Sequence, residues 1–399
     1  MNRLELIRLG PYRVFFPLGV LAGLVGVGHW ALWSVGWLKE SDSFLHATLQ
    51  IQGFLTCFVF GFLMTALPRF LGASPASVFE WGAAWAAEFL FIVLTLEKHW
   101  QAAQTCFLAA IAVAAVFAAR RFPRRTKKPP ASFLLVGLGL AQAVAGSLLM
   151  MASGFGLKSY AVMETGRQML QVGYVLCLVL GIAGYLAPFL MGYAGDPGSD
   201  PEAAPLRRAN VWTTLFHGGV GALIAGTFVS ERFYPRTSLW VRALAVLLHM
   251  GLFARIYRPM VRKETYVYFF RIACGMIPLG LIVQAGWPDH RLAGLHILFI
   301  GGYSLLVFSF ALVVVLTHAA QASLLNTRLV PLWITGIAVL IAMGFRLLAE
   351  WDAWRYPTWI HAASGTWILA GAFWLTYVFP KLWRFPIEPP PVKITSESE

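Results

Sequence analysis

The sequence predicts an all-α integral membrane protein, a bundle of about twelve transmembrane helices. Hydrophobic residues make up 58% of the 399 residues and charged residues only 12%, which is about half the charged fraction of an ordinary soluble domain. Apolar runs of about 20 residues, the length needed to cross the ~30 Å core of a bilayer, recur along almost the whole chain. The connections between these runs are too short to hold a soluble domain.

Each apolar run predicts one helix, because it is long enough to span the bilayer and ends at charged or turn-forming residues. The first run begins at Pro11 and exceeds the roughly 7–15 apolar residues of a signal-peptide core, so we expect it to remain as the first helix. In order, the predicted helices cover residues 12–38, 43–67, 78–96, 100–119, 131–152, 166–192, 209–229, 238–257, 266–286, 292–317, 330–349 and 357–380.

We expect a single polytopic membrane domain, residues 1–385, in two halves of six helices. The first half covers about 12–192 and the second about 209–380. The loop between them, 193–208, has the Gly, Pro and Asp residues typical of a flexible connector. The remaining segment, 386–399, is Pro-rich and then polar, which predicts a disordered cytoplasmic tail. No internal repeat at a fixed period is evident.

The net charge of +13 is distributed as a topology signal. If both termini are cytoplasmic, 20 of the 31 Lys and Arg residues fall on the inner side and 10 on the outer side, with Arg271 inside a helix. The positive-inside rule predicts this asymmetry. We therefore expect a multi-pass protein surrounded by membrane lipids, with both termini in the cytoplasm and no nucleic-acid partner.

Four histidines from four predicted helices lie at similar depths below the outer face. At 1.5 Å per helical residue, His46, His296 and His361 are about 5–8 Å deep and His29 is about 12 Å deep. Neutral imidazole is a good ligand for haem iron and copper, and helix bundles build cofactor sites from facing helices. Arg346 is available at the same rim for a cofactor carboxylate. The alternative is that each histidine only forms a hydrogen bond near the interface.

Two further ionisable residues lie within predicted helices. Glu88 is near the middle of the third helix, and its side chain is too short to reach either interface. Arg271 is about 10 Å deep, from where a long side chain can extend to the surface. The two residues could be ion-pair partners or parts of a proton path. They support a second hypothesis, a small-solute or proton-coupled transporter without a cofactor.

Two motifs carry a resemblance to a known family. The first is Pro11-Tyr12-Arg13-x-Phe15-Phe16, and the second is Gly53-Phe54 followed by Gly61-Phe62-Leu63-x-Thr65-Ala66-x-Pro68. They resemble the opening motif and the second helix of the NnrS family, bacterial haem- and copper-containing membrane proteins of the nitric oxide response. The resemblance implies an inner-membrane protein that binds a b-type haem. Its role would be to bind a diatomic gas such as nitric oxide or to pass electrons in the nitrosative-stress response.

The resemblance also implies site residues. His46 matches the first histidine of the family's His-x-His-Glu signature, but Thr48 and Leu49 replace the second histidine and the glutamate. Tyr185 stands where the family generally has an arginine. His46 and His296 are the implied iron ligands, and the other two outer histidines are alternates. Copper is implied less strongly, because it normally needs more than one good nitrogen ligand. A third hypothesis is an assembly partner that kept the fold and lost the metal chemistry.

Overall fold

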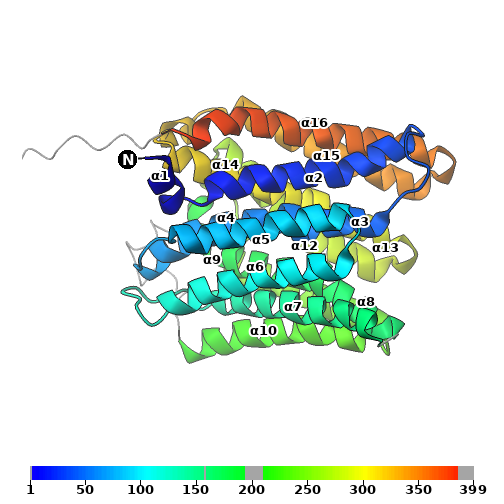
Figure 1. Ribbon diagram of the computed structural model, residues 1–399, viewed down its shortest axis with the longest axis horizontal. Helices are drawn as coiled ribbons and strands as arrows, with labels where there is room; N and C mark the ends of the chain where they lie inside the picture. Colours follow the sequence, from blue (N-terminus) through cyan, green and yellow to red (C-terminus); the bar gives the residue numbers. More distant parts are fainter. Residues whose placement is uncertain (1, 157–158, 194–209, 385–399) are drawn as a thin grey trace, which may run out of the picture.

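The structure is a computed structural model that describes residues 2–156, 159–193 and 210–384. Within these residues it contains twelve helices long and apolar enough to cross a membrane, which confirms the predicted all-α membrane bundle. The helices run side by side, and the chain enters and leaves the bundle at the same end (Figure 1). The predicted loop 193–208 lies almost wholly, and the tail 386–399 wholly, outside the described residues.

A short helix, α1 (Arg3–Leu9), precedes the twelve spans. Each span is one helix or several short helices in direct succession. The spans are α2 (Tyr12–Ser34), α3–η1–α4 (Ser43–Leu71), α5 (Val78–Leu96), α6 (Trp100–Arg121), α7 (Phe133–Ala152), α8–η3–α9 (Tyr160–Leu190), α10 (Val211–Ser230), α11–η5 (Pro235–Ala254), α12 (Thr265–Gly286), η6–α13–η7–α14 (Pro288–His318), α15 (Val330–Trp351) and η9–α16 (Ala353–Leu382).

The helix ends follow from local sequence. Asp42 begins α3, because its side chain accepts a hydrogen bond from the Leu45 N–H at 2.9 Å. Ser77 and Glu80 form a capping box at the start of α5. Gly72 ends α4 with φ 59°, a left-handed conformation that costs glycine little.

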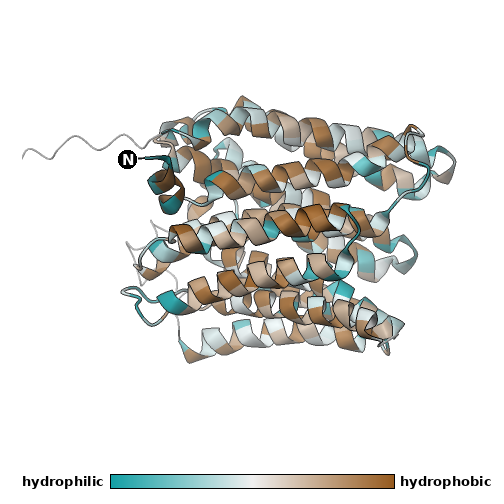
Figure 2. Cartoon of the chain, viewed as in Figure 1, coloured by the Kyte–Doolittle hydropathy of each residue, from teal (hydrophilic) through white to brown (hydrophobic). Residues whose placement is uncertain are grey.

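Apolar residues cover most of the length of the helices, and hydrophilic residues gather toward the two ends of the bundle (Figure 2). Some of the apolar residues point outward, as Leu21 and Val25 on α2 and Ile337 and Ile341 on α15 do. A soluble protein would expose such stripes to water, whereas lipid solvates them without cost.

Three spans form the centre of the bundle. The spans Ser43–Leu71, Tyr160–Leu190 and Pro288–His318 have 78%, 78% and 67% of their apolar windows buried, more than the other nine described spans. Each contains a π-helix, η1 (Leu49–Leu55), η3 (Met169–Tyr174) or η7 (Ile297–Ser304). Single-turn π-helices occur often at functional sites.

The central spans also repeat one packing arrangement. A Cβ atom built on Gly146 of α7 would lie 2.7 Å from the Gly166 oxygen of α8, and one built on Gly280 of α12 would lie 2.6 Å from the Gly294 oxygen of α13. In both pairs the second glycine is three residues before the π-helix. The two helices can approach this closely because neither glycine carries a side chain.

The first central span has the same arrangement with one substitution. Gly26 of α2 faces α3, but the residue three positions before η1 is His46 rather than glycine. We call each of these three crossings, a helix and the central span packed against it, a unit. The matching positions His46, Gly166 and Gly294 are 120 (166 − 46) and 128 (294 − 166) residues apart. The units therefore share a packing arrangement without a repeat at a fixed period.

Candidate functional site

His46 lies in α3, at the end of the bundle opposite the termini. Its Nδ1 is 2.9 Å from the carbonyl oxygen of Gly26. A carbonyl oxygen only accepts, so Nδ1 carries the hydrogen and donates it, and Nε2 keeps a free lone pair. The Trp30 ring lies edge-on at 6.0 Å between ring centroids. Backbone and aromatic contacts thus fix both the tautomer and the orientation of this imidazole.

His296 is the last residue of α13, directly before η7. Its Nδ1 is 2.7 Å from the carbonyl oxygen of Leu292, one helical turn earlier. The same reasoning gives an Nδ1–H donor and a free Nε2 lone pair. Metal-ligating histidines commonly donate their second ring N–H to a carbonyl in this way. Both histidines are therefore oriented as ligands usually are.

The structure brings His46, His296 and Arg346 together. The two imidazoles interact electrostatically with each other, and each also interacts with Arg346 of α15. Both rings are surrounded by protein, yet each residue keeps part of its surface accessible. Arg346 is 3.7 Å from the Glu350 carboxylate, and its Nη1 has no hydrogen-bond partner among the described residues. The guanidinium is therefore held loosely by Glu350, at a distance longer than a hydrogen bond, beside the imidazole pair.

The other two outer histidines have different surroundings. His29 interacts electrostatically with His46, but its Nε2 accepts the backbone N–H of Asp42 at 2.7 Å. That hydrogen bond anchors the start of α3, so His29 supports the position of His46. His361 is exposed, and its Nδ1 lies 3.1 Å from the Ser34 hydroxyl. The structure shows no contact between His361 and the imidazole pair.

Asp42 was missed by the sequence analysis, although an Asp directly before an apolar helix is a recognisable cap. Its carboxylate pairs with Lys98 at 3.2 Å. Burial opposes its ionisation, but the Leu45 N–H and the Lys98 ammonium outweigh burial and hold the pKa of Asp42 below its usual value. This ion pair ties the start of α3 to the α5–α6 turn.

Glu88 and Arg271 are not partners. Glu88 is fully buried, and neither carboxyl oxygen has a hydrogen-bond partner in the described part of the chain. Its electrostatic neighbours are Cys57 and Tyr174 of the two adjacent central spans. Arg271 is half-buried on α12. Of the two alternatives, an ion pair between them is therefore absent from the structure, and a shared role in a proton path stays a prediction.

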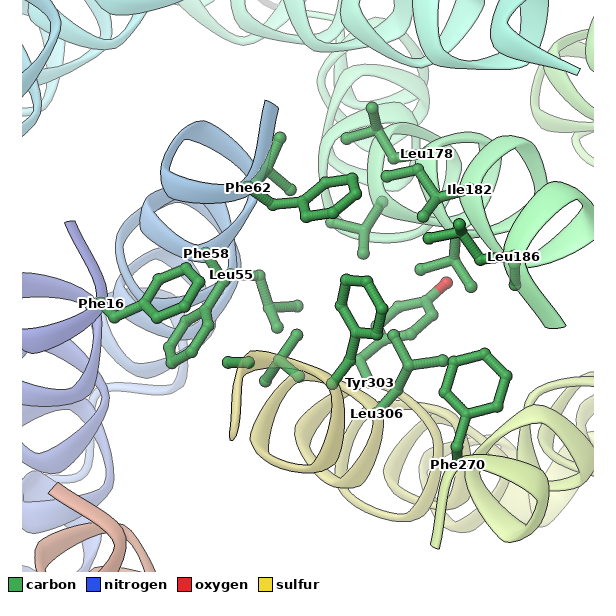
Figure 3. Close-up of a pocket in the computed structure, with 17 residues that line it drawn as sticks. Phe16, Leu55, Phe58, Phe62, Leu178, Ile182, Leu186, Phe270, Tyr303 and Leu306 are labelled. Carbon is green, nitrogen blue, oxygen red and sulfur yellow. The ribbon is translucent and has the colours of Figure 1, made fainter. Parts of the chain in front are cut away.

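An apolar cavity of about 70 Å³ lies between the three central spans. Its walls come mainly from Phe58 and Phe62 of α4, Leu178 of α9 and Leu306 of α14, with Tyr303 at one side (Figure 3). Tyr303 is the only polar residue in the lining, and its buried hydroxyl has no hydrogen-bond partner among the described residues. Cavities lined in this way stay dry and take up small apolar molecules.

The donor set distinguishes two kinds of metal group. No group of three or more His, Cys, Asp or Glu side chains that could hold a metal ion occurs within residues 2–156, 159–193 and 210–384. A porphyrin supplies four in-plane nitrogens and needs one or two ligands from the protein, whereas a bare copper ion usually takes three or four. Two imidazoles match the number of protein ligands that haem iron takes and are too few to complete a copper site.

The comparisons with known proteins agree with the fold. The model of one protein family, described as NnrS protein, matches residues 7–385 and so includes all twelve spans. No curated protein matches the chain.

Proposed function

Because this chain belongs to the NnrS family, membrane proteins associated with the response to nitric oxide, we propose that it holds a b-type haem at the end of the bundle opposite its termini. His46 and His296 are the iron ligands, and Arg346 pairs with a propionate. The observation that carries the proposal is the shared orientation of the two imidazoles. Each donates its Nδ1–H to a backbone carbonyl and keeps Nε2 free.

Haem in this position supplies an iron that changes oxidation state or binds a diatomic ligand. If both imidazoles held the iron, the protein would supply both of the ligands that haem takes, so electron transfer is the role that the pair supports best. The chain's own residues hold the geometry: Gly26 and Leu292 fix the tautomers, and His29 and Asp42 position α3.

A second role, binding of a diatomic gas, is favoured by the apolar cavity in Figure 3. The same central spans that carry the two histidines also line the cavity. Nitric oxide and similar gases are small and apolar, so a dry cavity in this position can store them. The distribution of Lys and Arg supports a cytoplasmic location for both termini and hence a bacterial inner-membrane protein with its haem near the outer face.

Absorbance spectra and metal analysis of the purified protein test the proposal. We expect a b-type reduced-minus-oxidised spectrum, nearly stoichiometric iron and much less copper. His46→Ala and His296→Ala should each lower the haem content of folded protein, whereas His99→Ala, an exposed histidine at the same end, should not. Carbon monoxide should shift the spectrum of reduced protein only if one imidazole leaves the iron. A haem-free preparation of wild-type protein would refute the proposal.

A cofactor-free transporter remains the second candidate, and the buried, unpartnered Glu88 favours it. Transporters commonly place such a carboxyl group at a coupling site within the membrane. Haem-free protein whose solute flux is lost in Glu88→Gln would support the transporter and not the haem protein.

A further inference from the structure

A cluster of cationic and aromatic side chains occupies the other end of the bundle, where the chain enters and leaves (Figure 1). Its members are Tyr12 and Arg13 at the start of α2, Arg69 in the last turn of α4 and His318 at the end of α14. Tyr12 and Arg13 belong to the first family motif and Arg69 directly follows the second, yet the proposed haem site uses none of them.

The cluster is held together by several contacts. The rings of Tyr12 and His318 are 5.5 Å apart, and the Arg13 guanidinium lies 5.0 Å from the centre of the Tyr12 ring. Arg69 Nη1 donates to His318 Nε2, and His318 Nδ1 donates to the Val314 carbonyl at 2.7 Å. His318 is therefore in the tautomer that accepts from Arg69 and keeps that guanidinium beside Tyr12.

Within residues 2–156, 159–193 and 210–384, the two arginine charges have no acidic counter-charge. Arg13 and Arg69 interact electrostatically with each other, and no Asp or Glu among the described residues appears in the surroundings of Arg13, Arg69 or His318. Arginine stays protonated in proteins, so the two cations repel each other. A structure that holds like charges together in this way is stabilised by an anion bound between them.

Part of the hydrogen-bonding capacity of the cluster is also unused. Arg13 is 97% buried and donates from Nη1 to the carbonyl of Leu382, the last residue of α16. Its Nε and the hydroxyl of fully buried Tyr12 have no partner among the described residues. The hydrogen bond to the end of α16 uses Nη1 of Arg13, and Nε has no partner in the described part of the chain. Arg69 is exposed, so a ligand can reach the buried donors past its side chain.

We propose that Tyr12, Arg13 and Arg69 form a binding site for a phosphate group at the termini end of the bundle. Two guanidinium groups and a phenol provide the forked donors that tetrahedral oxyanions accept. The phosphate belongs to a soluble phosphate compound or to the headgroup of an anionic phospholipid, because the helix ends that form the site lie at the level of the membrane surface.

Calorimetric titration of the detergent-purified protein with inorganic phosphate, at constant ionic strength in chloride, tests the site. We expect Arg69→Gln to weaken binding about tenfold or more, because a charged hydrogen bond is lost, and Tyr12→Phe to weaken it about fivefold. Arg8→Gln removes an exposed charge at the same end and should change the affinity less than about twofold. All three variants should keep their haem absorbance, which shows that they are folded.

Nanodiscs distinguish the two sources of phosphate. If phosphate binds equally in phosphatidylcholine and phosphatidylglycerol discs, the natural ligand is a soluble phosphate compound. If phosphatidylglycerol suppresses binding in the wild type, the headgroup occupies the site. The proposal is wrong if wild-type protein binds neither phosphate nor phosphatidylglycerol, or if Arg69→Gln and Arg8→Gln bind phosphate alike.

Discussion

The crossing of α2 and α3 at Gly26 makes a prediction about both stability and haem. In Gly26→Ala the new methyl group would lie 2.8 Å from Gln50 Nε2 and 3.0 Å from Leu49 Cβ. The Gln50 amide must then move and lose its 2.8 Å hydrogen bond to the Gly23 carbonyl, which costs about 1 kcal/mol. Crowding of Leu49 costs about 1 kcal/mol more, and the higher helix propensity of alanine returns about 1 kcal/mol.

We therefore expect Gly26→Ala to lose about 1 kcal/mol of unfolding free energy. It should also lower haem content, because the Gly26 carbonyl orients His46. Two glycines serve as matched controls. A Cβ on Gly28 meets nothing within 4 Å, so Gly28→Ala should gain about 0.5–1 kcal/mol and keep its haem. A Cβ on Gly146 meets a rigid backbone oxygen at 2.7 Å, so Gly146→Ala should be the least stable and still bind haem when folded.

Denaturant unfolding in detergent and Soret absorbance per folded protein measure these two quantities. The packing reasoning fails if Gly146→Ala is as stable as Gly28→Ala. The orientation of His46 by Gly26 is refuted if Gly26→Ala retains as much haem as Gly28→Ala.

Three further predictions concern charged residues. Asp42→Asn should destabilise the protein by at most about 1 kcal/mol at neutral pH, because the pair with Lys98 is partly exposed. Since the pKa of Asp42 is lowered in the folded protein, this contribution is complete above about pH 5 and is lost as the pH falls below about 3.9, the value for unfolded Asp. If the unfolding free energies of the wild type and Asp42→Asn differ by the same amount at pH 7 and at the acid limit, the prediction is contradicted. Glu231→Gln removes the buried partner of Arg242 and Arg291, both at 2.7 Å, and should lower the free energy of unfolding by about 3–5 kcal/mol. Glu164→Gln breaks the more exposed pair with Arg167 and should lower it by about 1 kcal/mol or less in the same denaturation assay. Glu88→Gln should leave haem absorbance and stability nearly unchanged, since no described residue pairs with the carboxylate; a loss of either would show a structural role for Glu88.

The fold was predictable because lipid requires every span to satisfy its own backbone and to show an apolar surface, and both requirements can be read from runs of residues. The π-helices were not predictable in this way. Leu49, Met169 and Ile297 begin π-helices in the central spans and Met250 begins another, η5 (Met250–Ala254), outside them. All four segments are as apolar as their neighbours, so the local sequence gives no sign of the extra residue per turn.

The candidate site was predictable only in part. Helix depth placed His46 and His296 in one layer, and the structure does bring them together. Depth gives no angle around the bundle, however, so it placed the exposed His361 in the same layer as an alternate ligand. It also left open an ion pair between Glu88 and Arg271 that the structure does not form. The role of His29 could not be predicted, because the bond that occupies its Nε2 comes from the backbone of Asp42 in a loop.

The glycine pairs of the second and third units, Gly146 with Gly166 and Gly280 with Gly294, restrict which positions of the central spans can accept a larger side chain. At Gly166 and Gly294 the neighbouring backbone is within 2.8 Å of where a side chain would start, so neither position can accept a histidine without separating its helices. In the first unit the corresponding residue of the central span is His46, and the crossing is closed by Gly26 alone, whose Cβ would lie 3.6 Å from the His46 oxygen. Of the three crossings, this one alone has room for an imidazole at that position, which is the position the proposed haem site uses.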